Sequence, residues 1–530
     1  MIDVTLSGGT DTNTSIAFNL WVKSKVLFWK NSLASLTIGL IDCADLTFMT
    51  HLKTRLGEIR GIDDGKVKSF LGIRYGQPPT NGRRFLPPSR TRPWTGTFDA
   101  TTYPNRAMQL KTESSRGEPI EGDMDEDCLF LNIVMPSNNP KSCPVLLWIH
   151  GGAFINGSGN EFDGSVLAHQ GNVVVVTVNF RLGLLGFLDL SSHGRRFASS
   201  ASNNISDLIL ALQWLQENIG DYGGDCNNVT IFGESSGGSA VLGLLAAPSA
   251  DNLYHKAIAH SPTCHYKTLS DPTDLILEQL NVDKNEYIET LLSMPAKKLV
   301  DLKGHYGICV DGLVVTRCAY EAIRDRGALG VPLLIGTNRE EGTLYTSGED
   351  EAQDHYPAWN IGLAKQTLCG GDPTNYLAAL ARAYPDASPG KFHEMIWTDM
   401  FRRNSLIAAE LSSAAGPGGW FYRFDYPANL PEYKKLKATH SCEMAFTFNL
   451  FANRDARGHI FHDRDNPDVR RLANLWSDTI IGFARTGQPN GFGLPHWPKY
   501  QSSDRKCLIF DASPRIEVDP DEIHRGLWDS

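Results

Sequence analysis

The stretch NVTIFGESSGGSAVLGLLAAP, Asn228 to Pro248, places a serine-containing turn between two apolar segments. The first segment, Asn228 to Phe232, is short, β-branched and aromatic, which is typical of a buried strand. The last segment, Ser239 to Pro248, is apolar and ends at a proline, which indicates a buried helix. The stretch therefore predicts a strand, a tight turn and a helix in that order.

The turn contains the pattern Gly-x-Ser-x-Gly, from Gly233 to Gly237, with Ser235 at its centre. The pattern alone is weak evidence, because the chain holds 49 glycines in 530 residues. Between a strand and a helix it gains weight, since such a turn exposes the serine as a nucleophile and is too strained and crowded for larger neighbours. We predict that Ser235 is a nucleophile; a structural glycine turn is the alternative.

Three further apolar runs have the composition of buried strands: Cys143 to Phe154, Asn172 to Gly183 and Val331 to Gly342. The segment Asp207 to Gly220 is apolar at helical spacing. Continuous apolar strands that alternate with helices predict an α/β fold, with a largely parallel central sheet and helices on both faces. Active sites of such sheets lie at the carboxyl ends of the strands. His150, Ser235 and Glu341 each follow a predicted strand.

The composition, 41% hydrophobic and 21% charged, is that of a globular chain. A net charge of −10 argues against nucleic acid or an anionic membrane as a partner. The ten cysteines are scattered and lack zinc spacing, and we expect no metal and no cofactor.

The first 48 residues differ from the rest of the chain. They lack the basic start of a signal peptide, and their apolar part carries Asp42 and Asp45, which interrupt any membrane span. We expect Met49 to be the natural start, residues 1–48 to be a dispensable extension, and residues 49–530 to form one large domain. We also expect a cytoplasmic protein without a membrane anchor.

A serine nucleophile needs a base, a carboxylate that orients the base, and donors for an oxyanion. The glycine-rich segment His150 to Phe154 can turn backbone N–H groups toward a carbonyl oxygen, and the N–H of Ser236 adds another donor. The base is harder to choose, because composition does not rank the fifteen histidines. Glu340, Glu341 and many other carboxylates compete as the acid.

The chain resembles the type-B carboxylesterase and lipase family, also called the cholinesterase-like esterases, from about Leu56 to Tyr500. The resemblance rests on motifs in one order: FLGIRYGQPP (70–79), RRFLPP (83–88), EDCLFLN (126–132), HGGAF (150–154), NFRLGLLGFL (179–188), GGDCNNVTIFGESSGG (223–238), GTNREEGTLY (336–345), THSCEMAFTF (439–448), FARTGQPN (483–490) and WPKY (497–500). It implies an α/β-hydrolase fold and the hydrolysis of small-molecule carboxylic esters. It also implies a nucleophile, acid and base at Ser235, Glu341 and His440.

The same resemblance implies that the oxyanion is held by the backbone N–H groups of Gly152, Ala153 and Ser236. Ala153 replaces the third glycine of the family motif. A backbone donor needs no particular side chain, so we expect the oxyanion hole to be retained. The Cβ of Ala153 should leave slightly less room for the acyl group of the substrate.

The sequence also differs from exported members of the family and from cholinesterases. Ala107 stands where exported members have the cysteine that bridges to Cys128, which fits a reduced, intracellular protein. The loop 108–127 lacks the tryptophan that binds choline. The resemblance further implies structural ion pairs between Arg84 and Glu126 and between Arg181 and Asp207.

Three readings of the function stay open. The first is a serine hydrolase for short-to-medium acyl esters, and the second is a specialised acyltransferase or a narrow natural-product or xenobiotic esterase. A non-catalytic, cholinesterase-like binding protein is the remote third. The sequence leaves the natural substrate and the oligomeric state open.

Overall fold

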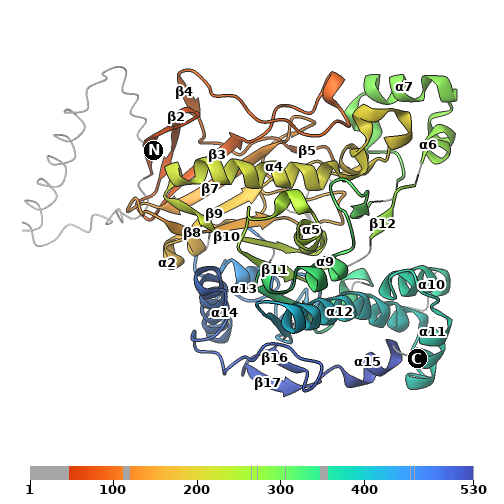
Figure 1. The fold of residues 1–530 in the computed structure, drawn as a ribbon. Coiled ribbons are helices and arrows are strands. Elements are labelled where there is room, and N and C mark those ends of the chain that lie inside the picture. Colours follow the sequence, from red (N-terminus) through yellow and green to blue (C-terminus); the bar gives the residue numbers. More distant parts are fainter. Residues whose placement is uncertain are drawn as a thin grey trace, which may run out of the picture. The chain divides into compact units, whose positions relative to one another are not determined.

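The computed structural model describes residues 47–110, 120–263, 266–270, 272–304, 306–346, 356–453, 455–458 and 460–528. Residues 1–46 of the expected extension, and residues 111–119 of the loop 108–127, lie outside the described residues. Figure 1 shows the domain that starts at Thr47.

A thirteen-stranded sheet forms the centre of the described domain. Its members are β1 (Phe48–Thr54), β2 (Gly57–Asp63), β3 (Val67–Arg74), β4 (Thr97–Asp99), β7 (Phe130–Pro136), β8 (Cys143–Ile149), β9 (Val174–Val178), β10 (Gly224–Glu234), β11 (Lys256–His260), β14 (Leu333–Asn338), β15 (Gly419–Phe424), β16 (Lys506–Phe510) and β17 (Arg515–Val518). The strand order is β1-β2-β3-β7-β9-β8-β10-β11-β14-β15-β16-β17, and β4 pairs with β2.

The middle of the sheet is parallel, as predicted. Every pair from β9 through β8, β10, β11, β14 and β15 to β16 is parallel, whereas the pairs from β1 to β9 along the other edge, and β16 with β17, are antiparallel. The apolar runs of the sequence form β8, β9, β10 and β14, and each is fully buried over most of its length. Parallel strands covered on both faces have no solvent side, which explains why these runs do not alternate with polar residues.

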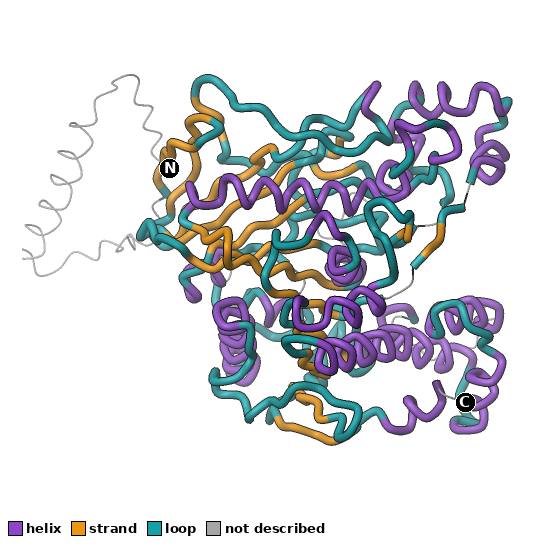
Figure 2. Tube along the Cα trace, in the orientation of Figure 1, coloured by secondary structure: helices purple, strands orange, loops and turns teal. Residues whose placement is uncertain are grey.

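Helices cover both faces of the sheet (Figure 2). They are α2 (Ser165–Gly171), α3 (Gly183–Phe187), α4 (Asn203–Asn218), α5 (Ser236–Leu245), α6 (Thr273–Leu280), α7 (Tyr287–Ser293), α8 (Ala296–Leu299), α9 (Ala319–Arg326), α10 (Tyr356–Thr367), α11 (Thr374–Ala383), α12 (Pro389–Ala415), α13 (Met444–Thr447), α14 (Pro467–Thr486) and α15 (Glu522–Trp528). Of the described helices, none is both long and apolar enough to cross a membrane.

The alternating side chains of each central strand enter two different cores. On β8, Leu147 packs in a core with α4, α5 and α12, whereas Leu146 and Trp148 pack in a second core with α2 and α14. This is the period of two that a strand imposes on its side chains. The sheet is therefore buried on both sides, and its functional groups can reach solvent only at the strand ends.

Both expected ion pairs are present. The Arg181 guanidinium donates to both carboxylate oxygens of Asp207, at 2.9 and 2.6 Å, and both side chains are buried. Arg84 Nε donates to Glu126 Oε2 at 2.7 Å. Arg181 is tied to α4 through Asp207, and Arg84 Nη1 also donates to the carbonyl oxygens of Leu291 and Met294 near the end of α7.

Candidate active site

Ser235 lies on the predicted turn, between the end of β10 and the start of α5. Its backbone has φ 57° and ψ −125°, a strained conformation for a residue with a side chain. The helix begins at Ser236, directly after Ser235 and three residues earlier than the sequence suggested. The turn therefore exposes one side chain between the last residue of a strand and the first of a helix.

The two glycines of the pattern are required by close packing. A Cβ atom on Gly237 would lie 2.1 Å from the carbonyl oxygen of Ile149, and one on Gly233 would lie 2.5 Å from the carbonyl oxygen of Gly237. Both distances are far inside van der Waals contact. The sequence pattern thus reflects the approach of the turn to the end of β8.

Glu341 and His440 come together although 99 residues separate them. Glu341 begins a short 3-10 helix, η10 (Glu341–Tyr345), just after β14. Its Oε2 accepts a hydrogen bond from His440 Nδ1 at 2.5 Å. Its Oε1 accepts bonds from Ser261 Oγ at 2.5 Å and from the backbone N–H of Asn338 at 2.6 Å. The carboxylate is therefore fixed on both oxygens and holds the histidine with its proton on Nδ1.

The neighbouring Glu340 makes different contacts. Its Oε2 accepts a weak bond from the backbone N–H of Ala438 at 3.3 Å, and its Oε1 lies 3.4 Å from Arg339 Nε. In this geometry Glu341, and not Glu340, orients the histidine.

A second carboxylate, which the sequence analysis did not single out, lies on the other side of the imidazole. Glu234, the last residue of β10, has its Oε1 3.1 Å from His440 Nε2 and accepts a bond from Ser441 Oγ at 2.6 Å. In the described part of the chain, Nε2 itself has no hydrogen-bond partner. Because Glu234 precedes Ser235, this contact brings Nε2 to the nucleophile turn. The only feature of the sequence that pointed to Glu234 was its position next to Ser235.

The electrostatics of the site follow from three buried carboxylates around one imidazole. Burial lowers the pKa of His440, but the charges of Glu234 and Glu341 outweigh this effect and raise the pKa to about 9. Burial, and then the negative charge of Glu341, raise the pKa of Glu443. Burial also raises the pKa of Glu234. The protonation of each group therefore depends on the others.

The glycine-rich segment after β8 lies against the nucleophile turn. A Cβ on Gly151 would lie 3.1 Å from the Cβ of Ser235. Gly152 has φ 101° and Ala153 has φ 56°, so two successive residues take left-handed backbone conformations. The N–H of Phe154 donates to Ser236 Oγ at 3.1 Å and ties the segment to α5.

The expected oxyanion donors have no competing acceptor in the described residues. Neither the N–H of Gly152 nor that of Ala153 donates to another group there. Ser236 is the first residue of α5, so its N–H has no acceptor within the helix. Ala153 adopts a left-handed conformation, with φ 56°, despite its Cβ.

His150, which also follows a strand, has a structural role. Its ring is buried and stacks on Phe180 with centroids 4.6 Å apart, and its Nδ1 lies 2.8 Å from the carbonyl oxygen of Gly151. Burial lowers the pKa of His150 to about 4, which keeps the ring neutral. It is the backbone after His150, and not its side chain, that faces the nucleophile turn.

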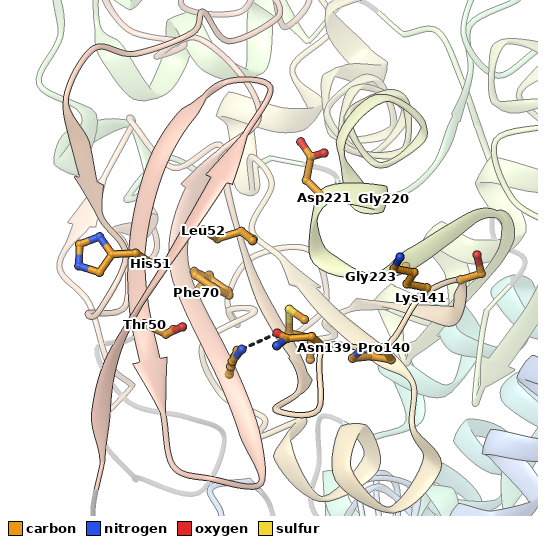
Figure 3. Close-up of a pocket in the computed structure, with 14 residues that line it drawn as sticks. Thr50, His51, Leu52, Phe70, Asn139, Pro140, Lys141, Gly220, Asp221 and Gly223 are labelled. Carbon is orange, nitrogen blue, oxygen red and sulfur yellow. Dashed lines mark hydrogen bonds between the residues drawn. The ribbon is translucent and has the colours of Figure 1, made fainter. Parts of the chain in front are cut away.

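A cavity of about 660 Å³ lies away from this site. It is lined by β1, β3 and the segments just before β8 and β10, including Leu52, Phe70, Lys141 and Asp221 (Figure 3). The segments before β8 and β10 lie at the amino ends of these two parallel strands, whereas Ser235 and Glu341 follow carboxyl ends. The cavity therefore does not belong to the candidate site. The described residues contain no cluster of three or more His, Cys, Asp or Glu side chains that could hold a metal ion.

Comparisons with known proteins identify the family of the chain. The sequence profile of the carboxylesterase family matches residues 49–528. The chain is 33% identical over 498 residues to the para-nitrobenzyl esterase of Bacillus subtilis (strain 168), covering 90% of this chain and 98% of that protein. It is 31% identical to human carboxylesterase 3, covering 90% of each chain.

Solved structures give the same result. The carboxylesterase EST55 of Geobacillus stearothermophilus is 33% identical and superposes with a TM-score of 0.78, covering 90% of this chain and all of that chain. A PNB esterase structure, 30% identical, superposes with a TM-score of 0.80 over 90% of this chain and 99% of that one.

Proposed function

The chain belongs to the carboxylesterase family and is a carboxylic ester hydrolase with an α/β-hydrolase fold, and from this premise we propose that Ser235, His440 and Glu341 form its catalytic triad. One observation carries the proposal. The 2.5 Å bond from His440 to Glu341 leaves Nε2 without a hydrogen-bond partner beside the strained Ser235 turn. An imidazole held in this way accepts a proton at Nε2.

In the first step, His440 Nε2 removes the hydroxyl proton of Ser235 as Oγ attacks the ester carbonyl carbon. The negative charge that develops on the carbonyl oxygen is stabilised by the backbone N–H groups of Gly152, Ala153 and Ser236. When the intermediate collapses, the C–O bond to the alcohol breaks, and His440 gives its proton to the leaving oxygen. An acyl group then remains on Ser235.

In the second step, a water molecule gives its proton to His440 Nε2 and attacks the acyl carbon. The same N–H groups hold the oxyanion, the bond to Oγ breaks, and the proton returns to Ser235 as the acid leaves. Glu341 accepts the Nδ1 hydrogen bond throughout and stabilises the imidazolium. Every step uses groups of this chain and water, so the proposal includes no metal or cofactor.

Short-to-medium acyl esters of small alcohols are the proposed substrates. Ala153 stands at the oxyanion segment with φ 56°, and its Cβ adds bulk where the family motif has glycine. The bulk next to the reacting carbonyl favours short acyl groups.

A reducing compartment is the proposed place of action. Cys128 is buried with a free thiol, and the family resemblance implies that Ala107 stands where exported members have its disulfide partner. Burial raises the pKa of the Cys128 thiol well above its ordinary value, which keeps it in the unreactive protonated form.

Initial rates on p-nitrophenyl acetate, butyrate, octanoate and palmitate test the proposal, with Ser235→Ala as the control. We expect the highest rates on acetate or butyrate and a loss of roughly 10⁴-fold or more in the variant. A fluorophosphonate should label the wild-type protein and not the folded variant. Near-normal turnover by Ser235→Ala would refute the assignment.

Two neighbouring glutamates provide a matched pair for the acid. Glu341→Gln removes the charge that orients His440 and should lower kcat by roughly 10⁴-fold. Glu340→Gln changes the adjacent carboxylate, which does not contact the imidazole, and should keep kcat within about threefold of the wild-type value. Equal losses in the two variants would contradict the choice of Glu341.

A further inference from the structure

A group of three aromatic rings packs beside His440 and has no part in the triad. Phe401 stacks on the imidazole with centroids 4.6 Å apart and planes at 23°. Tyr345 stacks on Trp397 with centroids 3.9 Å apart and planes at 10°. The planes of Trp397 and Phe401 are also nearly parallel, at 22°. We call Tyr345, Trp397 and Phe401 the ring stack. Their nearly parallel rings lie next to the proposed base.

The sequence brings these rings together in two ways. Trp397 and Phe401 are four residues apart on α12, so they lie on the same face of the helix. Tyr345 is the last residue of η10, which begins with Glu341. A Cβ on Gly342 would lie 2.0 Å from the carbonyl oxygen of Glu394, so glycine at this position lets η10 approach α12 closely. The turn that carries the proposed acid also carries Tyr345.

The three rings differ in how their surroundings hold them. Phe401 is 2% exposed and contributes to the core. The indole N–H of Trp397 donates to His393 Nε2 at 3.0 Å, which fixes the orientation of that ring. Tyr345 is half-buried, and its hydroxyl makes no hydrogen bond in the described part of the chain.

The Tyr345 hydroxyl is available to a ligand. It has no protein partner in the described residues, and a tyrosine hydroxyl can donate a hydrogen bond to an acceptor oxygen. The Tyr345 ring centroid is only 5.9 Å from that of His440. Burial, and then the charges of Glu341 and Glu234, raise the pKa of Tyr345 well above its ordinary value, so the hydroxyl remains a donor at any pH where the enzyme works. A fixed donor next to the reacting groups is suited to bind substrate.

We propose that the Tyr345 hydroxyl donates a hydrogen bond to the substrate and that the enzyme prefers short esters with an acceptor oxygen near the ester group over plain alkyl esters. The inference rests on the proposed triad and adds the polar contact that selects the substrate class. An alkyl ester of the same shape displaces water from the hydroxyl but does not accept a hydrogen bond. Its kcat/KM is therefore lower than that of the acceptor-bearing ester.

Two pairs of esters with equal shape test the proposal. On the acyl side, p-nitrophenyl methoxyacetate is compared with p-nitrophenyl butyrate; on the alcohol side, 2-methoxyethyl acetate is compared with butyl acetate. The ratio of kcat/KM within each pair is measured for the wild-type enzyme, for Tyr345→Phe and for the control Tyr384→Phe. The Tyr384 hydroxyl bonds to His524 in the C-terminal helix, 3.0 Å away, and lies on a different part of the chain. A ratio within one protein sample is independent of the fraction that is folded.

We expect Tyr345→Phe to lower the preference for the acceptor-bearing ester by roughly two- to tenfold in one pair, and Tyr384→Phe to leave both ratios unchanged. The pair that responds identifies the side of the ester that the hydroxyl contacts. Unchanged ratios in both pairs, in a variant that hydrolyses esters, would overturn the proposal.

A second measurement needs no variant. The wild-type ratio in each pair is divided by the ratio of the alkaline hydrolysis rates of the same two esters, which removes their intrinsic reactivity. We expect an excess of roughly two- to tenfold for the acceptor-bearing member of one pair. No excess in either pair would also overturn the role of Tyr345. Failure of the triad would be distinguishable, because Ser235→Ala would then keep its activity while the ester ratios could still be measured.

Discussion

Glu234 should set the pH at which the enzyme becomes active, and Glu234→Gln tests this. Its carboxylate lies 3.1 Å from His440 Nε2, and both side chains are buried. Two unit charges at this distance attract each other by about 5 kcal/mol at an effective dielectric constant of about 20. This value is an upper bound, because both charges are spread over two atoms and burial raises the pKa of Glu234, which reduces its average charge. We therefore expect the substitution to lower the pKa of His440 by about one to two units.

The direction of the shift in the pH profile follows from the role of His440 as the base. A histidine that accepts a proton is active in its neutral form, so kcat/KM rises with pH as His440 loses its proton. In the wild-type enzyme the pKa of His440, raised to about 9, places this rise in the alkaline range. Without the negative charge of Glu234 the imidazolium is less stable, and the rise should move to lower pH.

The assay is the pH profile of kcat/KM for p-nitrophenyl butyrate between pH 5 and 10, with spontaneous hydrolysis subtracted. Glu443→Gln is the matched control, because this buried carboxylate raises the same pKa but has a smaller effect than Glu234 and Glu341. We expect a downward shift in both variants and the larger shift in Glu234→Gln. An unchanged or upward shift in Glu234→Gln would refute the reasoning.

Three further substitutions and one truncation test the fold. Gly237→Ala would place a Cβ 2.1 Å from a carbonyl oxygen of β8 and should abolish activity. Gly362→Ala, on an open face of α10, should raise the free energy of unfolding by about 0.5–1 kcal/mol. Urea denaturation and initial rates are measured for both variants. Asp207→Asn leaves the buried Arg181 without its ion partner and should lower the free energy of unfolding by about 3–5 kcal/mol; a loss below 1 kcal/mol would contradict this account. A chain that starts at Met49 should fold and keep the wild-type kcat, and its failure to fold would show that the preceding residues are needed.

Local patterns in the sequence were enough to predict much of the fold. Continuous apolar runs predicted β8, β9, β10 and β14, because strands in the middle of a covered parallel sheet have no polar face. The turn at Ser235 was predictable for a related reason. A strained elbow in close contact with β8 admits only glycine at Gly233 and Gly237, so the steric requirement is visible in the sequence.

The partners of the serine were not predictable from local pattern. Composition and spacing did not rank fifteen histidines or choose between Glu340 and Glu341, and only the family resemblance singled out His440 and Glu341. Ser235 follows β10, Glu341 follows β14 and His440 follows β15, and no short segment of sequence encodes that these strands lie close together in one sheet.

The sequence by itself determined the α/β fold and the turn at Ser235, because these depend on periodicity and on glycines within a few residues of one another. Its motifs, in their order along the chain, carried the resemblance to the family. Only the tertiary structure decided which charges and rings surround the imidazole: Glu234 at Nε2, Glu341 at Nδ1 and the stack of Tyr345, Trp397 and Phe401. The pKa of a buried group and the contacts of a substrate depend on distances of a few ångströms between segments far apart in the chain, and those distances exist only once the sheet has assembled.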